Sequence, residues 1–119
     1  MARYEIERDV SVALVICRVE GELDDSMTTR MAQDCRAELI RARHDYSTLR
    51  VLFDNSRGTV ASPSSAKIMA DAMGDLWREG DRTAVVTADS LSKVRAKQTM
   101  RDGGMVFISE KAARMWLAA

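Results

Sequence analysis

Short apolar strands alternate with amphipathic helices along this sequence, and that alternation limits the possible folds more than any single motif. Alternating or continuous apolar side chains predict strands at 3–7, 10–19, 49–53, 83–87 and 105–108. Helical spacing and capping residues predict helices at 24–44, 62–80, 89–102 and 110–117. Strands that alternate with helices form mostly parallel sheets, so we expect an α/β fold with five strands and about four helices.

The strand order follows from the same pattern. The short connection at Arg8-Asp9 predicts that the first strand pairs with the second as an antiparallel hairpin. If consecutive strands are neighbours, right-handed crossovers put the helices on one face of the sheet. The other face would then be thinly covered, and Thr83, Val85 and Thr87 suit a half-polar face of that kind. At 119 residues, we expect one domain spanning 1–119.

Composition narrows the class of protein. Acidic and basic residues are equal at 18 each, and this neutral balance argues against nucleic acid as a partner. Residues 1–7 run directly into a strand pattern without a signal peptide, and no apolar run is long enough to span a membrane. Cys17 and Cys35 are not spaced as a redox or zinc pair, so we expect two buried thiols and a cytoplasmic protein.

Polar residues gather where the third predicted strand ends. Asp54 follows that strand, and a loop with Asn55, Ser56 and Arg57 leads to a helix that begins at Ser62-Pro63. Carboxyl ends of strands are where α/β folds place ligands and modifications. We therefore predict a partner or ligand loop made of these side chains: Asp54, Asn55, Ser56, Arg57 and Ser62.

Ser64 and Ser65 occupy the first turn of the same helix. A phosphate there would add nearly two negative charges beside the positive end of the helix dipole. The alternatives are that both serines merely fill the first turn, or that the free amides there hold an anion.

Eight methionines are many for this length. Met27, Met31, Met69 and Met73 fall on the inward faces of two predicted helices, where core filling is the usual role. The alternative is an adaptable apolar pocket between these helices and the sheet, suited to a lipid-like ligand.

The helix predicted at 89–102 combines two faces. Leu91 and Val94 are expected to point inward, while Lys93, Lys97 and Arg101 recur every four residues on another side. Such a basic row is either a solvated face or a docking stripe for an acidic partner.

Catalytic and cofactor signals are weak. One histidine and two separated cysteines do not form a zinc site. Gly103-Gly104 precedes a strand rather than opening a helix, so it is not a phosphate cradle. We therefore expect no cofactor, no metal and no enzyme activity.

Several of these features together resemble a known family. They are Gly21 after the second strand, Asp54 at the end of the third, the strand Arg82-Thr83-Ala84-Val85-Val86, and Val106-Phe107-Ile108-Ser109 followed by Ala112 and Trp116-Leu117. This arrangement resembles the SpoIIAA-like, STAS/CRAL-TRIO-type small bacterial proteins over nearly the whole chain. The resemblance implies a right-handed β-α superhelix.

The resemblance also implies a function. Founding members are anti-sigma-factor antagonists that bind a partner kinase and are phosphorylated on a serine in an Asp-Ser-Ser-Gly sequence. Here the corresponding stretch is Pro63-Ser64-Ser65-Ala66, with Ser64 at the modified position and neither the acid nor the glycine retained. The leading hypothesis is a non-catalytic cytoplasmic regulatory module with a kinase or anti-sigma-type partner, and a homodimer is compatible with it. The alternative is a domain that binds a small apolar ligand, as related CRAL-TRIO-type domains do.

Overall fold

The computed structural model describes residues 2–59, 62–98 and 100–119. In these ranges the chain forms five strands, one short 3₁₀ turn and four α-helices. Their bounds are β1 (Arg3–Asp9), η1 (Val10–Val12), β2 (Leu14–Gly21), α1 (Asp25–Asp45), β3 (Arg50–Gly58), α2 (Pro63–Met73), β4 (Arg82–Val86), α3 (Ser90–Lys97), β5 (Gly104–Phe107) and α4 (Glu110–Ala118).

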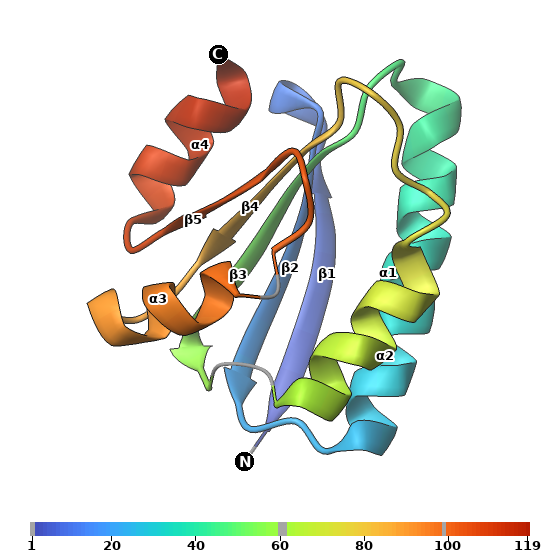
Figure 1. The fold of residues 1–119 in the computed structure, drawn as a ribbon. Coiled ribbons are helices and arrows are strands. Elements are labelled where there is room, and N and C mark those ends of the chain that lie inside the picture. The colour runs from blue at the N-terminus through green and yellow to red at the C-terminus, as the bar shows by residue number, and fades with distance from the viewer. Residues whose placement is uncertain (1, 60–61, 99) are drawn as a thin grey trace.

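The strands form one sheet in chain order, β1-β2-β3-β4-β5 (Figure 1). β1 pairs antiparallel with β2, and every later neighbour pairs in parallel. The predicted strand number, order and orientation are therefore confirmed, as is the predicted number of helices in the described ranges. One predicted strand is divided, because residues 10–12 form η1 and Ala13 adopts a left-handed backbone with φ 53° before β2 begins.

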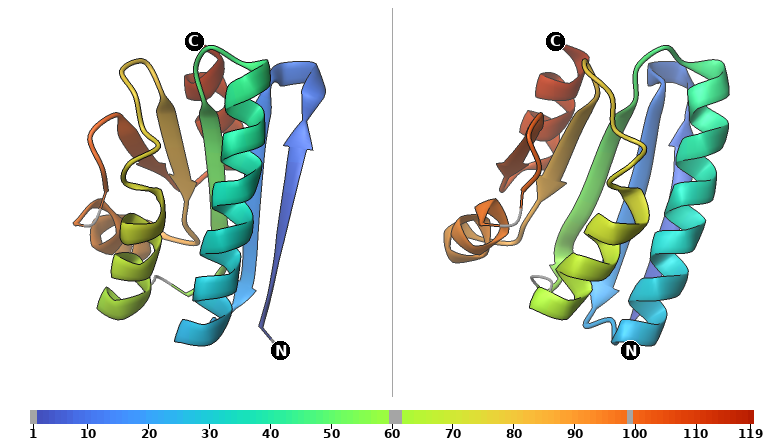
Figure 2. Two further views of the ribbon diagram at one scale, coloured as in Figure 1. Left: turned by 90° about the vertical axis from the view of Figure 1, so that its right-hand side faces the viewer. Right: turned by 45° about the vertical axis from the view of Figure 1, so that its right-hand side comes forward.

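Helices cover both faces of the sheet, which corrects the expectation of one thinly covered face. α1 and α2 lie on one side and α4 on the other (Figures 1 and 2). Under α4, Ala113 and Leu117 pack with Leu14, Ile16 and Leu52 of the sheet. The predicted half-polar residues of β4 lie on the opposite face, the one that α1 and α2 cover.

The core on the α1 side is built by an apolar stripe of α1. Cys35, Leu39 and Ala42 are buried against Val15 and Val51. Cys17 and Cys35 are both buried free thiols, as expected. A hydrogen bond with Cys35 and, to a smaller extent, burial raise the pKa of the Cys17 thiol. This thiol therefore stays protonated at neutral pH.

Helix α2 begins as predicted but ends early. The Ser62 hydroxyl accepts a hydrogen bond from the Ser65 amide at 3.2 Å, and Pro63 stands in the first turn. The helix ends at Met73 instead of continuing to residue 80. Arg36 of α1 donates to the Ala72 carbonyl at 2.8 Å, an acceptor that a longer helix would use for its own residue 76. Trp77 therefore lies outside the helix, although it still packs against the core.

Helix α3 is also shorter than predicted. It ends at Lys97, and Leu91 and Val94 are 62% and 58% exposed rather than inward. The predicted basic row is broken for the same reason, because Arg101 lies beyond the end of the helix. In the described parts of the chain, no helix is long and apolar enough to cross a lipid bilayer.

Candidate functional site

The polar segment predicted as a loop is mostly strand. β3 continues through residue 58, so residues 54–58 alternate between the two faces of the sheet. Asn55 points to the α2 side, whereas Asp54 and Ser56 point to the α4 side. The structure therefore divides the predicted site residues between two sites, a cavity on the α2 side of the sheet and a hollow on the α4 side.

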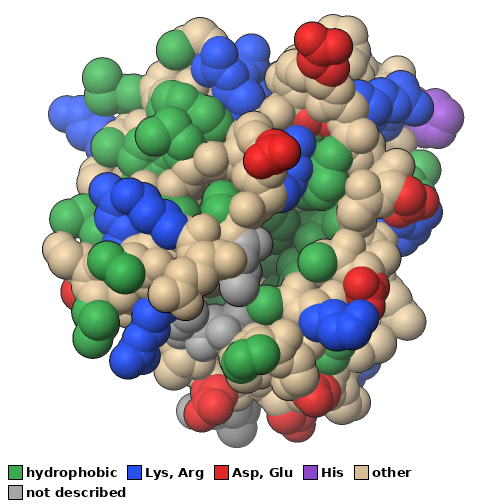
Figure 3. Space-filling model, in the orientation of Figure 1, with side chains coloured by type: hydrophobic (Ala, Val, Ile, Leu, Met, Phe, Trp, Pro, Cys, Tyr) green, Lys and Arg blue, Asp and Glu red, His purple; other side chains and the backbone are tan. Residues whose placement is uncertain are grey.

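The larger place is a cavity of about 500 Å³ between α2 and the sheet. Its floor comes from the face of β2, β3 and β4 that carries Val19, Phe53 and Val85, and its walls come from α1, α2, α3 and the segment before β5. Figure 3 shows the opening as a hollow with hydrophobic side chains in its depth. The half-polar strand β4 thus faces a cavity rather than solvent.

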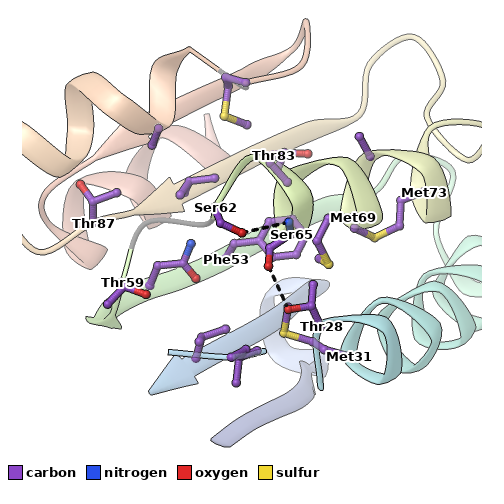
Figure 4. A pocket seen from close by; sticks show the side chains of 18 of the residues that line it. Thr28, Met31, Phe53, Thr59, Ser62, Ser65, Met69, Met73, Thr83 and Thr87 are labelled. Atoms are coloured by element: carbon purple, nitrogen blue, oxygen red, sulfur yellow. Dashed lines mark hydrogen bonds between the residues drawn. The ribbon is translucent and has the colours of Figure 1, made fainter. Parts of the chain in front are cut away.

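Three of the four predicted pocket methionines line this cavity. Met31 comes from α1, and Met69 and Met73 come from α2 (Figure 4). Met27 is half-buried on α1 and is not among the lining residues. Residues such as Ala66 and Ala70 of α2 add small apolar surface between the methionines.

Hydroxyl groups surround the end of the cavity at the carboxyl ends of the strands. Ser65 is 7% exposed, and its hydroxyl lies 3.3 Å from Thr28 Oγ1, a contact that joins α2 to α1 (Figure 4). Ser62 and Ser65 line the cavity, whereas Ser64 does not. Ser64 is exposed, and its hydroxyl donates to Asp25 Oδ1 of α1 at 3.1 Å.

The far end of the cavity carries a cation. Arg101 lines it together with Trp77 and Thr83. The guanidinium carbon of Arg101 lies 4.3 Å from the centroid of the Trp77 ring, which is a cation–π contact. Nη1 of Arg101 donates a long hydrogen bond of 3.4 Å to Thr83 Oγ1.

The second place is a charged hollow on the α4 face of the sheet. Arg18 Nη1 lies 2.6 Å from both Asp54 and Glu110. Ser56 donates to Asp54 Oδ1 through its amide at 3.0 Å and its hydroxyl at 2.6 Å, so Asp54 fixes the backbone two residues further on. Arg57 is exposed and pairs weakly with Glu20 at 3.5 Å.

In this hollow, Arg18 neutralises the negative charges of Asp54 and Glu110. Burial raises the pKa of Asp54, but hydrogen bonds from Ser56 and Arg18 outweigh it and leave the pKa below its usual value. The hydrogen bond from Arg18 lowers the pKa of Glu110 as well, despite an opposing effect of burial. Both carboxylates are therefore ionised and paired at neutral pH, which makes them structural partners of Arg18 rather than proton-transfer groups.

Sequence reasoning missed several cavity residues. Thr28 was on no predicted stripe, and Thr83, Val85 and Thr87 were assigned to the wrong face. Their period-2 spacing did show that they share a face, but not which one. Both interpretations of the basic row, a solvated face and a docking stripe, put Arg101 on a helix, and no feature of its sequence neighbourhood indicates that the helix ends before it.

Comparison with known proteins supports the fold. The sequence matches no family model and no curated protein. A DUF3478-family protein with a SpoIIAA-like fold from Shewanella loihica aligns with a TM-score of 0.68 and 17% identity, over 98% of this chain and 93% of that one. The anti-sigma factor antagonist SpoIIAA in its unphosphorylated form aligns with a TM-score of 0.63 and 16% identity, over 95% of this chain and 94% of that one.

A STAS domain from Rhodobacter sphaeroides, described as an antisigma-factor antagonist, aligns more loosely. Its TM-score is 0.48 at 25% identity, over 85% of this chain and 97% of that one. The two stronger alignments cover nearly the whole of each chain, so this chain has a SpoIIAA-like fold. The fold implied by the sequence resemblance is confirmed.

Proposed function

We propose that this chain is a non-catalytic cytoplasmic domain that binds a small, largely apolar ligand between α2 and the sheet. The observation that carries the proposal is the cavity of about 500 Å³ that Met31, Met69 and Met73 line. Small-molecule sites are typically about 300–1,000 Å³ and mostly apolar, with a few polar groups placed at their edges. This cavity has that size and that distribution of polar groups.

The lining favours binding over chemistry. Methionine side chains are flexible and polarizable, so they adapt to ligands of different shape. Only two charged residues stand among the described lining residues, Glu22 and Arg101, and they lie toward opposite ends of the cavity. A general acid and base must reach the same substrate atom or its neighbours, which this separation does not allow.

A brominated probe tests the proposal in solution. Trp77 lines the cavity, while Trp116 belongs to α4 and packs against the other face of the sheet. In a Trp116→Phe protein, the remaining fluorescence reports on Trp77. We expect bromodecanol to quench this fluorescence in a saturable manner and decanol to compete with it. Quenching of Trp77 that rises linearly without saturation would exclude a defined site.

A second function is favoured by the contacts of Ser64. This exposed hydroxyl stands at the start of α2 and touches Asp25 at the start of α1. A phosphate on Ser64 would gain from the dipole of α2 but would lie beside the Asp25 carboxylate. We propose that such a phosphate separates the first turns of α1 and α2, and so alters a surface that binds a kinase or anti-sigma-type protein. Ser65, the other candidate, is buried, which makes Ser64 the better substrate.

Hydrogen exchange tests this switch in the isolated protein. Ser64→Asp is expected to accelerate amide exchange in the first turns of α1 and α2, because the new carboxylate repels Asp25. Ser64→Asn is the matched neutral control and should exchange as the wild type does. Equal exchange in both variants would remove the physical basis of the switch. Phosphopeptide mapping of protein from its native cells should place any phosphate on Ser64 and not on Ser65.

A further inference from the structure

Arg101 lies in the cavity without a carboxylate partner. In the described ranges it makes no ion pair, and its guanidinium contacts the Trp77 ring and donates a long hydrogen bond to Thr83. A guanidinium has five N–H donors, so most of them are free to bind another group. Gly103 also leaves space here, because a Cβ at that position would lie 3.1 Å from Nη1 of Arg101.

The buried carboxylate of Asp81 is not available to Arg101. Asp81 Oδ1 accepts from Arg43 Nη1 at 2.9 Å and from the Leu49 amide at 2.8 Å. Asp81 Oδ2 accepts from Arg43 Nη2 at 2.6 Å and from the Arg78 amide at 2.8 Å. Each oxygen already has two donors, which fills the lone-pair positions of a carboxylate. Asp81 therefore acts on Arg101 only through the electrostatic attraction between their charges.

Arg101 is nevertheless charged. Burial lowers the pKa of its guanidinium, and the fields of Asp81 and Asp102 oppose that effect. An arginine in a protein keeps its proton at neutral pH even so. A cation that is partly removed from water and has few fixed acceptors gains most from a ligand that brings an anion.

We propose that the ligand of this cavity is an amphipathic anion whose carboxylate binds Arg101. The proposal rests on the apolar-ligand function argued above and names the chemical class of that ligand. The apolar body of the ligand lies over Val85 and Phe53, between the Arg101 end and the Thr87 end of the cavity. Thr83 and Thr87 are four residues apart on extended chain, which corresponds to a length of about 13 Å.

Charge along the cavity fixes the direction of the ligand. Glu22 follows β2 at the end where the strands finish, and it would repel a carboxylate there. Arg101 attracts the carboxylate at the other end, beside the first residues of β4. The guanidinium carbon lies over the Trp77 ring, and the N–H donors that Arg101 does not use on Thr83 remain for the paired hydrogen bonds that arginine makes with carboxylates.

Two probes of equal length separate this proposal from the one on which it rests. Decanoate and decanol share an apolar chain and differ in the head group, and both are titrated below their aggregation limits by calorimetry at neutral pH. We expect wild-type protein to bind decanoate at least about tenfold more tightly than decanol, as a charge-assisted pair of hydrogen bonds provides.

Variants assign the difference to one side chain. Arg101→Gln should weaken decanoate binding by about tenfold and leave decanol binding unchanged, because only the charged head group loses its partner. Arg101→Lys should retain part of the preference for decanoate over decanol, since lysine keeps the positive charge but lacks the planar pair of guanidinium N–H donors. Arg95→Gln on the exposed side of α3 is the matched control and should bind both probes as the wild type does.

The outcomes are distinct. If wild-type protein binds decanol as tightly as decanoate, the carboxylate proposal is wrong and the apolar cavity stands. If the preference for decanoate persists in Arg101→Gln, the carboxylate binds elsewhere and the proposal is equally wrong. If neither probe binds, both this proposal and the ligand-binding function fall.

Discussion

Asp81 joins three separate segments of the chain. It is 4% exposed and accepts hydrogen bonds from Arg43 of α1 and from backbone amides before β3 and β4. Burial raises the pKa of this carboxyl, but the Arg43 pair and the two amides outweigh burial and lower the pKa overall. Its charge is therefore part of the folded structure.

Asp81→Asn should destabilise the protein by about 3 kcal/mol, because it leaves Arg43 partly buried without a counter-charge and turns an acceptor into a donor. Chemical denaturation at neutral pH measures the free energy of unfolding. Asp75→Asn is the control, since Asp75 pairs with Arg36 on the surface and its loss should be far smaller. Equal losses in the two variants would contradict the structural role of Asp81.

For single residues, the sequence predicted the chemical role of a side chain better than its location in the fold. It identified Ser62 as a helix cap and the methionines as cavity candidates, because caps and apolar spacing are local properties. It misplaced Arg101, because a row of basic residues at helical spacing is the same whether the helix ends at residue 97 or continues to 102. The position of Arg101 depends on packing against Trp77, which is distant in the sequence.

Among the elements, α2 determines whether the cavity is open. Its residues Ala66, Met69 and Met73 face the cavity, while the neighbouring Lys67 points to solvent. The helix is fixed at its start by the Ser62 cap and at its end by Arg36, so it forms a wall of defined position.

Ala66→Trp should block the cavity and reduce decanol affinity by at least about tenfold, because a large ring would occupy the space of the probe. Lys67→Trp adds the same ring one residue away on the outer side and should leave the affinity unchanged. Calorimetric titration of both variants provides the comparison. Unaltered binding in Ala66→Trp would place the probe outside the cavity.

Helix starts were predictable, whereas the ends of α2, α3 and β3 were not. Asp24, Ser62, Asp89 and Ser109 each cap a helix through a side-chain oxygen, and side chains of this kind mark helix starts in a sequence. β3 was predicted to stop at residue 53 because the next residues are polar, yet those residues stay extended through pairing of Arg57 and Gly58 with β2. Pairing partners are non-local, so a polarity change alone did not mark the end of this strand.

The whole molecule should lose stability in acid. The pKa values of Asp54, Asp81 and Glu110 lie below the ordinary values of 3.8 for Asp and 4.5 for Glu. Groups with lowered folded-state pKa values contribute their full stabilisation above those ordinary values and lose it as the pH falls through the folded-state values. We expect the free energy of unfolding to be nearly constant from about pH 7 to pH 5 and to decrease below about pH 4.

Urea denaturation at a series of pH values measures this decrease. Asp81→Asn should show a shallower decrease below pH 4 than the wild type, since it has one fewer carboxyl to protonate. A stability that rises as the pH falls below 4 would contradict the assigned ion pairs.

Most of the architecture could be predicted from the order of strands and helices. The coverage of the second face could not, for an identifiable reason. The handedness rule concerns helices that connect two parallel strands, and α4 follows the last strand without returning to the sheet. It is free to pack on either side, and it covers the face where Leu14, Ile16 and Leu52 need burial.

The central claim is that an apolar ligand occupies the space between α2 and β4. A crystal structure of the protein with bromodecanol, using the anomalous signal of bromine, tests it most directly. The predicted result is a single bromine peak inside the cavity, in contact with Met69 or Val85. A cavity filled only by its own side chains, with bromine found on the outer surface or nowhere, would contradict it.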